Sequence, residues 1–167
     1  DTLRAYILFM APPDKDLEWS YEGVDGMHRW MSRVWRFVTE TAADIAGGCG
    51  VAAAGDAAAK TLHREMHRVT GKVTHDVERF QFNTAIAAVM ELMNALARLE
   101  GDDAVTRSVR QEALEAAVAM LAPIVPHMSE ALYAELKPGA AMTWPTVDES
   151  ALVQDEIELM LQVNGKL

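Results

Sequence analysis

Cysteine is almost absent from this sequence, which has a single one, Cys49, in 167 residues. A lone thiol has no partner for a disulfide or a shared metal, so small disulfide-held scaffolds are excluded and a reducing compartment is expected. No apolar run approaches the roughly 20 residues that span a bilayer. Residues 1–20 also lack a basic start, an apolar stretch and a cleavage site. We therefore expect an unprocessed, soluble, cytoplasmic protein with no membrane partner.

The short motifs of common catalytic sites are also missing. The sequence has no nucleophile elbow, phosphate-cradling glycine loop or paired-cysteine metal site. His63 and His67 share a helix face, but a zinc-protease helix needs its glutamate directly after the first histidine, and Glu65 is two along on the far side. No third ligand is evident. We therefore expect no metal site and no catalytic residue here, with a metal-dependent helical enzyme as a remote alternative.

Positive charge is scarce. The chain has 15 Lys and Arg against 25 Asp and Glu, a formal net charge of −10 at pH 7. This balance argues against a nucleic-acid binder unless the cations cluster. Hydrophobic residues make up 50% of the chain, which suits one domain with a core large enough to fold unaided.

Helical periodicity dominates the first half. Residues 2–11 predict a short apolar helix that Pro12 and Pro13 end, because proline cannot continue a helix. Ser20 is placed to cap the next helix, and Asp56 to cap a helix over about residues 57–77. Between these two helices, the glycines and alanines of residues 40–56 indicate a connector. The apolar positions of the helix after Ser20 recur at spacings of three and four, at Val24, Met27, Met31, Val34, Trp35 and Val38.

Three further helices and a tail complete the predicted order. One helix starts at Asn83 or Thr84, one runs from Ala104 to about Leu121, and Pro126 opens the last. Residues 138–154 show turn formers without a period, whereas residues 155–167 alternate and contain an Asn-Gly turn signal, as in a strand that enters a hairpin. The prediction is an all-α antiparallel bundle of about five helices with a short leading helix and a β-like C-terminal tail.

Basic residues form stripes on two sequence-adjacent helices. Arg29 and Arg33 lie one turn apart, and Arg36 continues near the same side. The next helix carries Lys60, Arg64, Arg68 and Lys72 every four residues, with His63, His67 and His75 alongside. Such stripes attract backbone phosphates by charge without reading bases, so together they predict a phosphate-tracking surface. The alternative is a solvated face, or pairing with carboxylates of the same bundle.

Large aromatics accompany these stripes. Stacking on bases is one interpretation, but large aromatics between helices are more often core, and core packing is our expectation for them. They are Trp30, Trp35, Phe37, Phe80 and Phe82.

Several stretches together resemble bacterial-type leucyl-tRNA synthetases. Residues 1–38, with Asp-Thr-x-Arg, the "LEW" connector and the Arg-Val-Trp helix, are similar to the stretch after the KMSKS loop of that family. "RFQFNTAIAAVMELMN" at 79–94, "PIVPHMSEALYAEL" at 123–136, Trp144-Pro145 and "QVNGK" at 162–166 follow in the family's order. Isoleucyl and valyl synthetases share the bundle plan, but Arg-Val-Trp-Arg and "QVNGK" favour the leucyl family.

The resemblance implies an anticodon-binding-type helical domain at residues 20–137. Residues 1–19 would end the stem-contact region, 138–154 form a connector and 155–167 start a small C-terminal domain. Because Asp1 is not methionine and the chain stops inside the alternating segment, we expect a fragment. Its parent would use ATP and Mg to charge tRNA(Leu) with leucine, with catalytic residues and cofactors outside this fragment. Its partners would be tRNA(Leu) and the other domains.

The family resemblance supports only some of the candidate tRNA-binding residues. Arg29 and Arg33 match the arginine pair of the family's tRNA-facing Arg-x-x-x-Arg helix, whereas Arg36, Lys60, Arg64, Arg68 and Lys72 are assigned by spacing alone. The rival to this tRNA-docking function is a purely structural or protein-interaction bundle whose basic faces pair with acidic helices.

Overall fold

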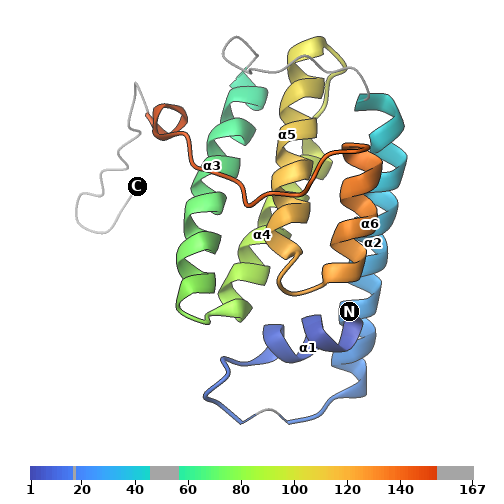
Figure 1. The fold of residues 1–167 in the computed structure, drawn as a ribbon, viewed down its shortest axis with the longest axis vertical. Coiled ribbons are helices and arrows are strands. Elements are labelled where there is room, and N and C mark those ends of the chain that lie inside the picture. The colour runs from blue at the N-terminus through green and yellow to red at the C-terminus, as the bar shows by residue number, and fades with distance from the viewer. Residues whose placement is uncertain (17, 46–56, 154–167) are drawn as a thin grey trace, which may run out of the picture.

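The computed structural model describes residues 1–16, 18–45 and 57–153. Within them the elements are α1 (Thr2–Met10), α2 (Tyr21–Ile45), α3 (Ala57–Glu78), α4 (Phe82–Arg98), α5 (Ala104–Leu121), α6 (Pro126–Leu136) and the short 3₁₀ helix η1 (Glu149–Leu152). Helices α2 to α6 run side by side, and α1 lies across one end of them (Figure 1). The predicted all-α bundle with a short leading helix is confirmed. The predicted β-like tail, the Asp56 cap and Cys49 lie outside the described residues.

Helix α5 lies at the centre of the bundle. It packs against α2, α3, α4 and α6, and every residue from Ala116 to Leu121 is buried. A helix that is apolar on all sides must be covered on all sides. None of the described helices is both long enough and apolar enough to cross a bilayer.

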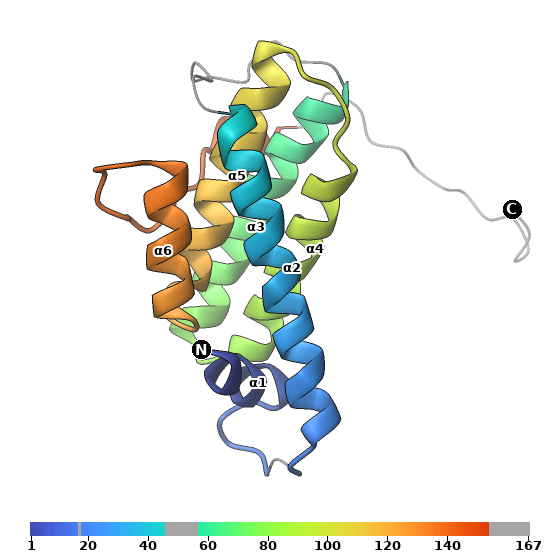
Figure 2. The ribbon, with the colours of Figure 1, turned by 90° about the vertical axis from the view of Figure 1, so that its right-hand side faces the viewer.

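The central position of α5 separates α2 from α3. Helix α3 packs on α4, α5 and η1, whereas α2 packs on α1, α5 and α6. The two helices therefore flank α5 from different sides (Figures 1 and 2). The expectation that the two basic stripes lie on neighbouring helices is wrong, because adjacency in sequence did not make α2 and α3 neighbours in space.

Helix α1 is docked on the first turn of α2. Ser20 caps α2 as predicted, with its Oγ accepting a hydrogen bond from the Gly23 amide at 3.1 Å. The fully buried Tyr6 of α1 holds this junction, because its hydroxyl accepts from the Ser20 amide at 2.9 Å and donates to the Glu18 carbonyl at 3.4 Å. This junction sets where the arginines of α2 lie relative to α1.

The turn between α3 and α4 is tighter than the sequence predicted. The Gln81 amide donates to the Asp76 carbonyl at 2.7 Å and the Phe80 amide to the Val77 carbonyl at 3.1 Å, with Phe80 at φ +58°. This is the Schellman pattern of a helix C-terminus. Helix α4 therefore starts at Phe82 with Gln81 at its N-cap, and the predicted start at Asn83 or Thr84 is wrong by one turn or less. Phe80 points outward and is 65% exposed, so it is not the core residue that we expected.

Candidate nucleic-acid interface

The three arginines of α2 lie on its outer face. Arg29, Arg33 and Arg36 are exposed, while the opposite side of the helix is buried at Met27, Trp30, Met31, Val34 and Val38. In the described part of the chain, no carboxylate oxygen lies within 4.0 Å of a nitrogen of these arginines. Their charges are therefore available to an anion from outside the domain.

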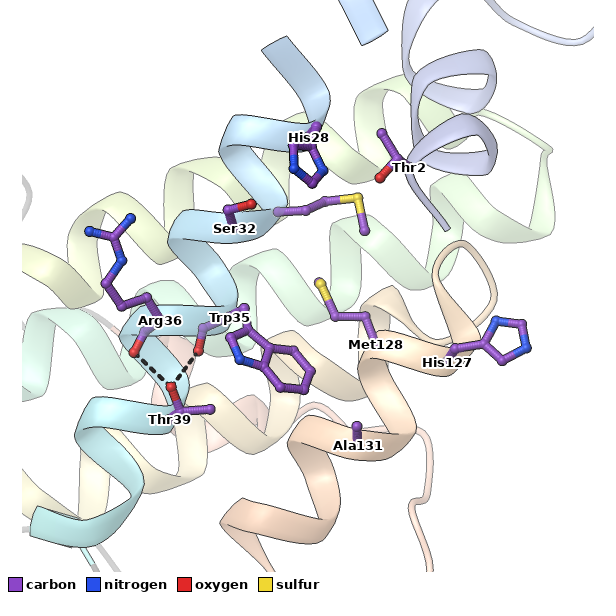
Figure 3. A pocket seen from close by; sticks show the side chains of 10 residues that line it. Thr2, His28, Ser32, Trp35, Arg36, Thr39, His127, Met128 and Ala131 are labelled. Atoms are coloured by element: carbon purple, nitrogen blue, oxygen red, sulfur yellow. Dashed lines mark hydrogen bonds between the residues drawn. The ribbon is translucent and has the colours of Figure 1, made fainter. Parts of the chain in front are cut away.

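A groove of about 720 Å³ runs beside this arginine face, between α2 and α6 and up to the start of α1. Its lining contains His28, Trp35 and Arg36 from α2 and His127 and Met128 from α6, and no described lining residue is acidic. Figure 3 shows the Trp35 indole extending from α2 toward α6, whereas the Arg36 side chain extends from α2 away from the indole. A flat aromatic face thus lies in an open groove beside the arginine face.

The position of Trp35 differs from the sequence-based prediction. The spacing of apolar residues predicts Trp35 on the buried stripe of α2, but the residue is 44% exposed, whereas Trp30 is buried. The reason is that α6 meets this part of α2 with Met128 and the small Ala131, which leave the groove open. A signal for the groove was present in sequence, because His28, Ser32, Trp35 and Thr39 recur at spacings of four and three and so form a second stripe beside the apolar one.

The cations of α3 divide into two groups. Arg68 forms a forked pair with Glu65, at 2.8 Å from Nε and 2.6 Å from the terminal nitrogen. Lys72 donates to Asp76 one turn later. By contrast, no carboxylate among the described residues lies within 4.0 Å of the side-chain nitrogens of Lys60 or Arg64. Two of the four predicted phosphate contacts therefore already have acidic partners within α3.

Hydrogen bonds from the basic partners lower the pKa of both carboxylates in these pairs. The Arg68 hydrogen bond lowers the pKa of Glu65. Burial by itself raises the pKa of Asp76, but hydrogen bonds from Lys72 and Thr84 outweigh it, so the pKa is lowered. Because the pKa of Asp76 is lowered in the folded state, its pair with Lys72 contributes stability above the unfolded pKa of an aspartate, about 3.9. This stability is lost as the pH falls through the folded-state pKa.

Asp76→Asn is expected to lower the free energy of unfolding by about 1–2 kcal/mol at pH 7, because the Lys72 hydrogen bond loses its charge. Asp76 is only 12% exposed at its side chain, so water replaces that bond poorly. Denaturant unfolding at several pH values measures the effect, and the difference from the unsubstituted chain should shrink below about pH 4. Glu65→Gln, in the more exposed pair, is the control and should cost less than about 1 kcal/mol. A cost at Asp76 that does not change with pH would contradict this assignment.

Residues 59–167 match the family described as "Anticodon-binding domain of tRNA ligase". The chain belongs to this family. The anticodon-binding domain is 60% identical to leucine-tRNA ligase of Thiobacillus denitrificans over 171 residues, and 51% identical to leucine-tRNA ligase of Methylobacillus flagellatus over 174 residues. Each match covers 100% of this chain, and 20% and 21% of those proteins respectively. The chain thus spans about a fifth of the length of these relatives.

A solved structure supports the fold of the anticodon-binding domain. A chain in the crystal structure of the ternary complex of Agrobacterium radiobacter K84 agnB2 LeuRS, tRNA and LeuAMS superimposes with a TM-score of 0.83 at 32% identity. The match covers 99% of the domain and 22% of that chain. The resemblance drawn from the sequence is confirmed at the level of the family and of the helical bundle.

Proposed function

We propose that this anticodon-binding domain docks tRNA(Leu) by its backbone phosphates on the outer face of α2. Its parent is a cytoplasmic leucine-tRNA ligase that uses ATP and Mg to activate leucine and charge the tRNA. The observation that carries the proposal is that Arg29, Arg33 and Arg36 are exposed and have no ion pair with the described residues, in a chain of net charge −10. In so acidic a chain, such a cluster provides local positive potential where the net charge would repel RNA.

The groove beside these arginines extends the proposed contact. The half-exposed Trp35 lies in it, so RNA that contacts the arginine face and reaches the groove can place a base on the indole face. Aromatic faces hold bases by stacking without reading their sequence. Lys60 and Arg64 are weaker candidates on α3, and Arg68 and Lys72 weaker still, because phosphate would have to replace Glu65 and Asp76 as their partners.

Trp35→Ala in the complete ligase is expected to weaken tRNA(Leu) binding about tenfold, since one base-aromatic stack contributes about 1–3 kcal/mol. Equilibrium filter binding at fixed salt measures the change. Phe80→Ala is the matched control, because Phe80 is also an exposed aromatic but lies at the α3–α4 turn, away from the groove. Equal loss for both variants, or none for Trp35→Ala, would remove the groove from the contact surface.

Aminoacylation by the complete protein tests the function itself. The expected result is charging of tRNA(Leu) with leucine in the presence of ATP and Mg, with no comparable charging of isoleucine and valine tRNAs by their own amino acids. The relatives named above are leucine-tRNA ligases, which supports leucine over the other two. Charging with isoleucine or valine would instead support the neighbouring synthetases. A complete protein that charges none of the three tRNAs would leave the structural-bundle alternative.

A further inference from the structure

Two histidines of α3 and a glutamate of α5 bring their ligand atoms together, and the proposed tRNA contact uses none of them. His63 Nε2 is 3.2 Å from His67 Nε2 and 3.5 Å from Glu112 Oε2. One ligand atom from each of the three residues lies within 4.8 Å of the others. The two imidazole rings meet edge to face with centroids 4.6 Å apart. The cluster bridges two helices of the core.

Two of these separations are close to those of ligands around zinc. Bonds of about 2.0–2.2 Å from zinc to nitrogen or oxygen place the ligand atoms of a tetrahedron about 3.3–3.6 Å apart. The 3.5 Å from His63 Nε2 to Glu112 Oε2 has this spacing, and the 3.2 Å between the two Nε2 atoms is slightly shorter. All three ligand atoms lie within 4.8 Å of one another, so adjustment of the side chains would bring them to one ion.

The third ligand was not visible from sequence spacing. Glu65 is the acidic residue nearest to the two histidines in the sequence, but it is paired with Arg68. Glu112 lies 45 positions after His67 and reaches the cluster only because α5 packs on α3. Side-chain exposures of 21% at His63 and 47% at Glu112 leave a route for an ion and for a water ligand.

His67 also contacts the connector after α6. The histidine is only 4% exposed. The Asp148 amide of this connector donates to His67 Nδ1 at 3.2 Å. Zinc on Nε2 requires the ring proton on Nδ1, so binding would have to move the Asp148 amide away from this nitrogen.

We propose that His63, His67 and Glu112 form a zinc site, with water in the fourth position. Zinc there would tie α3 to α5 and would change the contact of His67 with the connector at residues 146–148. Trp144 already fastens the same connector, because its indole Nε1 donates to Thr74 Oγ1 at 2.9 Å. The site is independent of the tRNA contact on α2, so either proposal can fail without the other.

Isothermal titration of the metal-free 167-residue chain with Zn²⁺ alone tests the site. The chain carries Cys49→Ser, so that the lone thiol cannot supply a ligand. We expect one zinc per chain, and binding at least about tenfold weaker in both His63→Ala and Glu112→Gln. His75→Ala, an exposed histidine of the same helix, should bind as the parent does. Zinc should also raise the melting temperature of the parent and of His75→Ala, but not of the two ligand variants.

Co²⁺ provides a second readout that tests coordination and not folding alone. Tetrahedral cobalt absorbs strongly in the visible range, so the parent chain should develop these bands with one equivalent, and Glu112→Gln should not. Circular dichroism shows whether the variants remain helical. Absence of saturable binding, or unchanged affinity in either His63→Ala or Glu112→Gln, would overturn the proposal.

Discussion

Replacing Gly23 with alanine is expected to lower the free energy of unfolding by about 2 kcal/mol, although alanine is the better helix former. A Cβ at position 23 would stand 2.6 Å from Cε2 of the Tyr6 ring and 3.4 Å from Cδ2. The ring cannot move away easily, because it is fully buried and its hydroxyl is bonded to Ser20 and Glu18. Overpacking of this kind costs about 1–3 kcal/mol.

Gly26 in the same helix provides the matched control. A Cβ there meets only the end of the Arg29 side chain, at 3.9 Å, so Gly26→Ala should stabilise α2 by up to about 1 kcal/mol through helix propensity alone. Urea unfolding of the two variants measures the opposite signs. If Gly23→Ala proves as stable as Gly26→Ala, then α1 is not held on α2 by the Tyr6 contact.

If the proposed function is right, charge reversal at Arg29 and Arg33 together weakens tRNA(Leu) binding by the complete protein at least about tenfold at low salt. Both side chains are exposed and have no ion pair with the described residues. Their removal therefore takes away phosphate contacts without breaking bonds inside the domain. The slope of log affinity against log salt should fall in magnitude by about two, or about one per lost phosphate contact.

The control for this variant keeps the change of net charge and moves it elsewhere. Arg79 and Arg98 are exposed residues of the α3–α4 hairpin, and their double reversal to glutamate should leave the salt slope near that of the parent. Unfolding curves of both double variants show whether the bundle is intact. Equal losses for the two pairs would mean that tRNA responds to total charge and not to the face of α2.

The helices were predictable because their signals are local. Ser20 as a cap, Pro126 at a first turn and the three-and-four spacing from Met27 to Val38 all act within a turn or two of one helix. Their arrangement depends on contacts between distant segments. The burial of residues 116–121 on all sides reflects the position of α5 between α2 and α3, and the spacing of the two basic stripes does not indicate this position.

Some features of the candidate site were predictable from local sequence, and others depended on contacts between helices. The partners of Arg68 and Lys72 were available from the sequence, since Glu65 and Asp76 stand three and four residues away on the same helix. The openness of the groove at Trp35 depends on what α6 brings to it, so the single-helix pattern assigned that indole wrongly to the core. Glu112 beside His63 likewise required the packing of α5 on α3.

An experimental structure of the complete protein bound to tRNA(Leu) tests the proposed contact most directly. We predict guanidinium nitrogens of Arg29 and Arg33 about 3 Å from phosphate oxygens, with the RNA lying along the outer face of α2. A complex in which that face is covered by another domain of the same protein, or is open to solvent while the tRNA lies elsewhere, would contradict it.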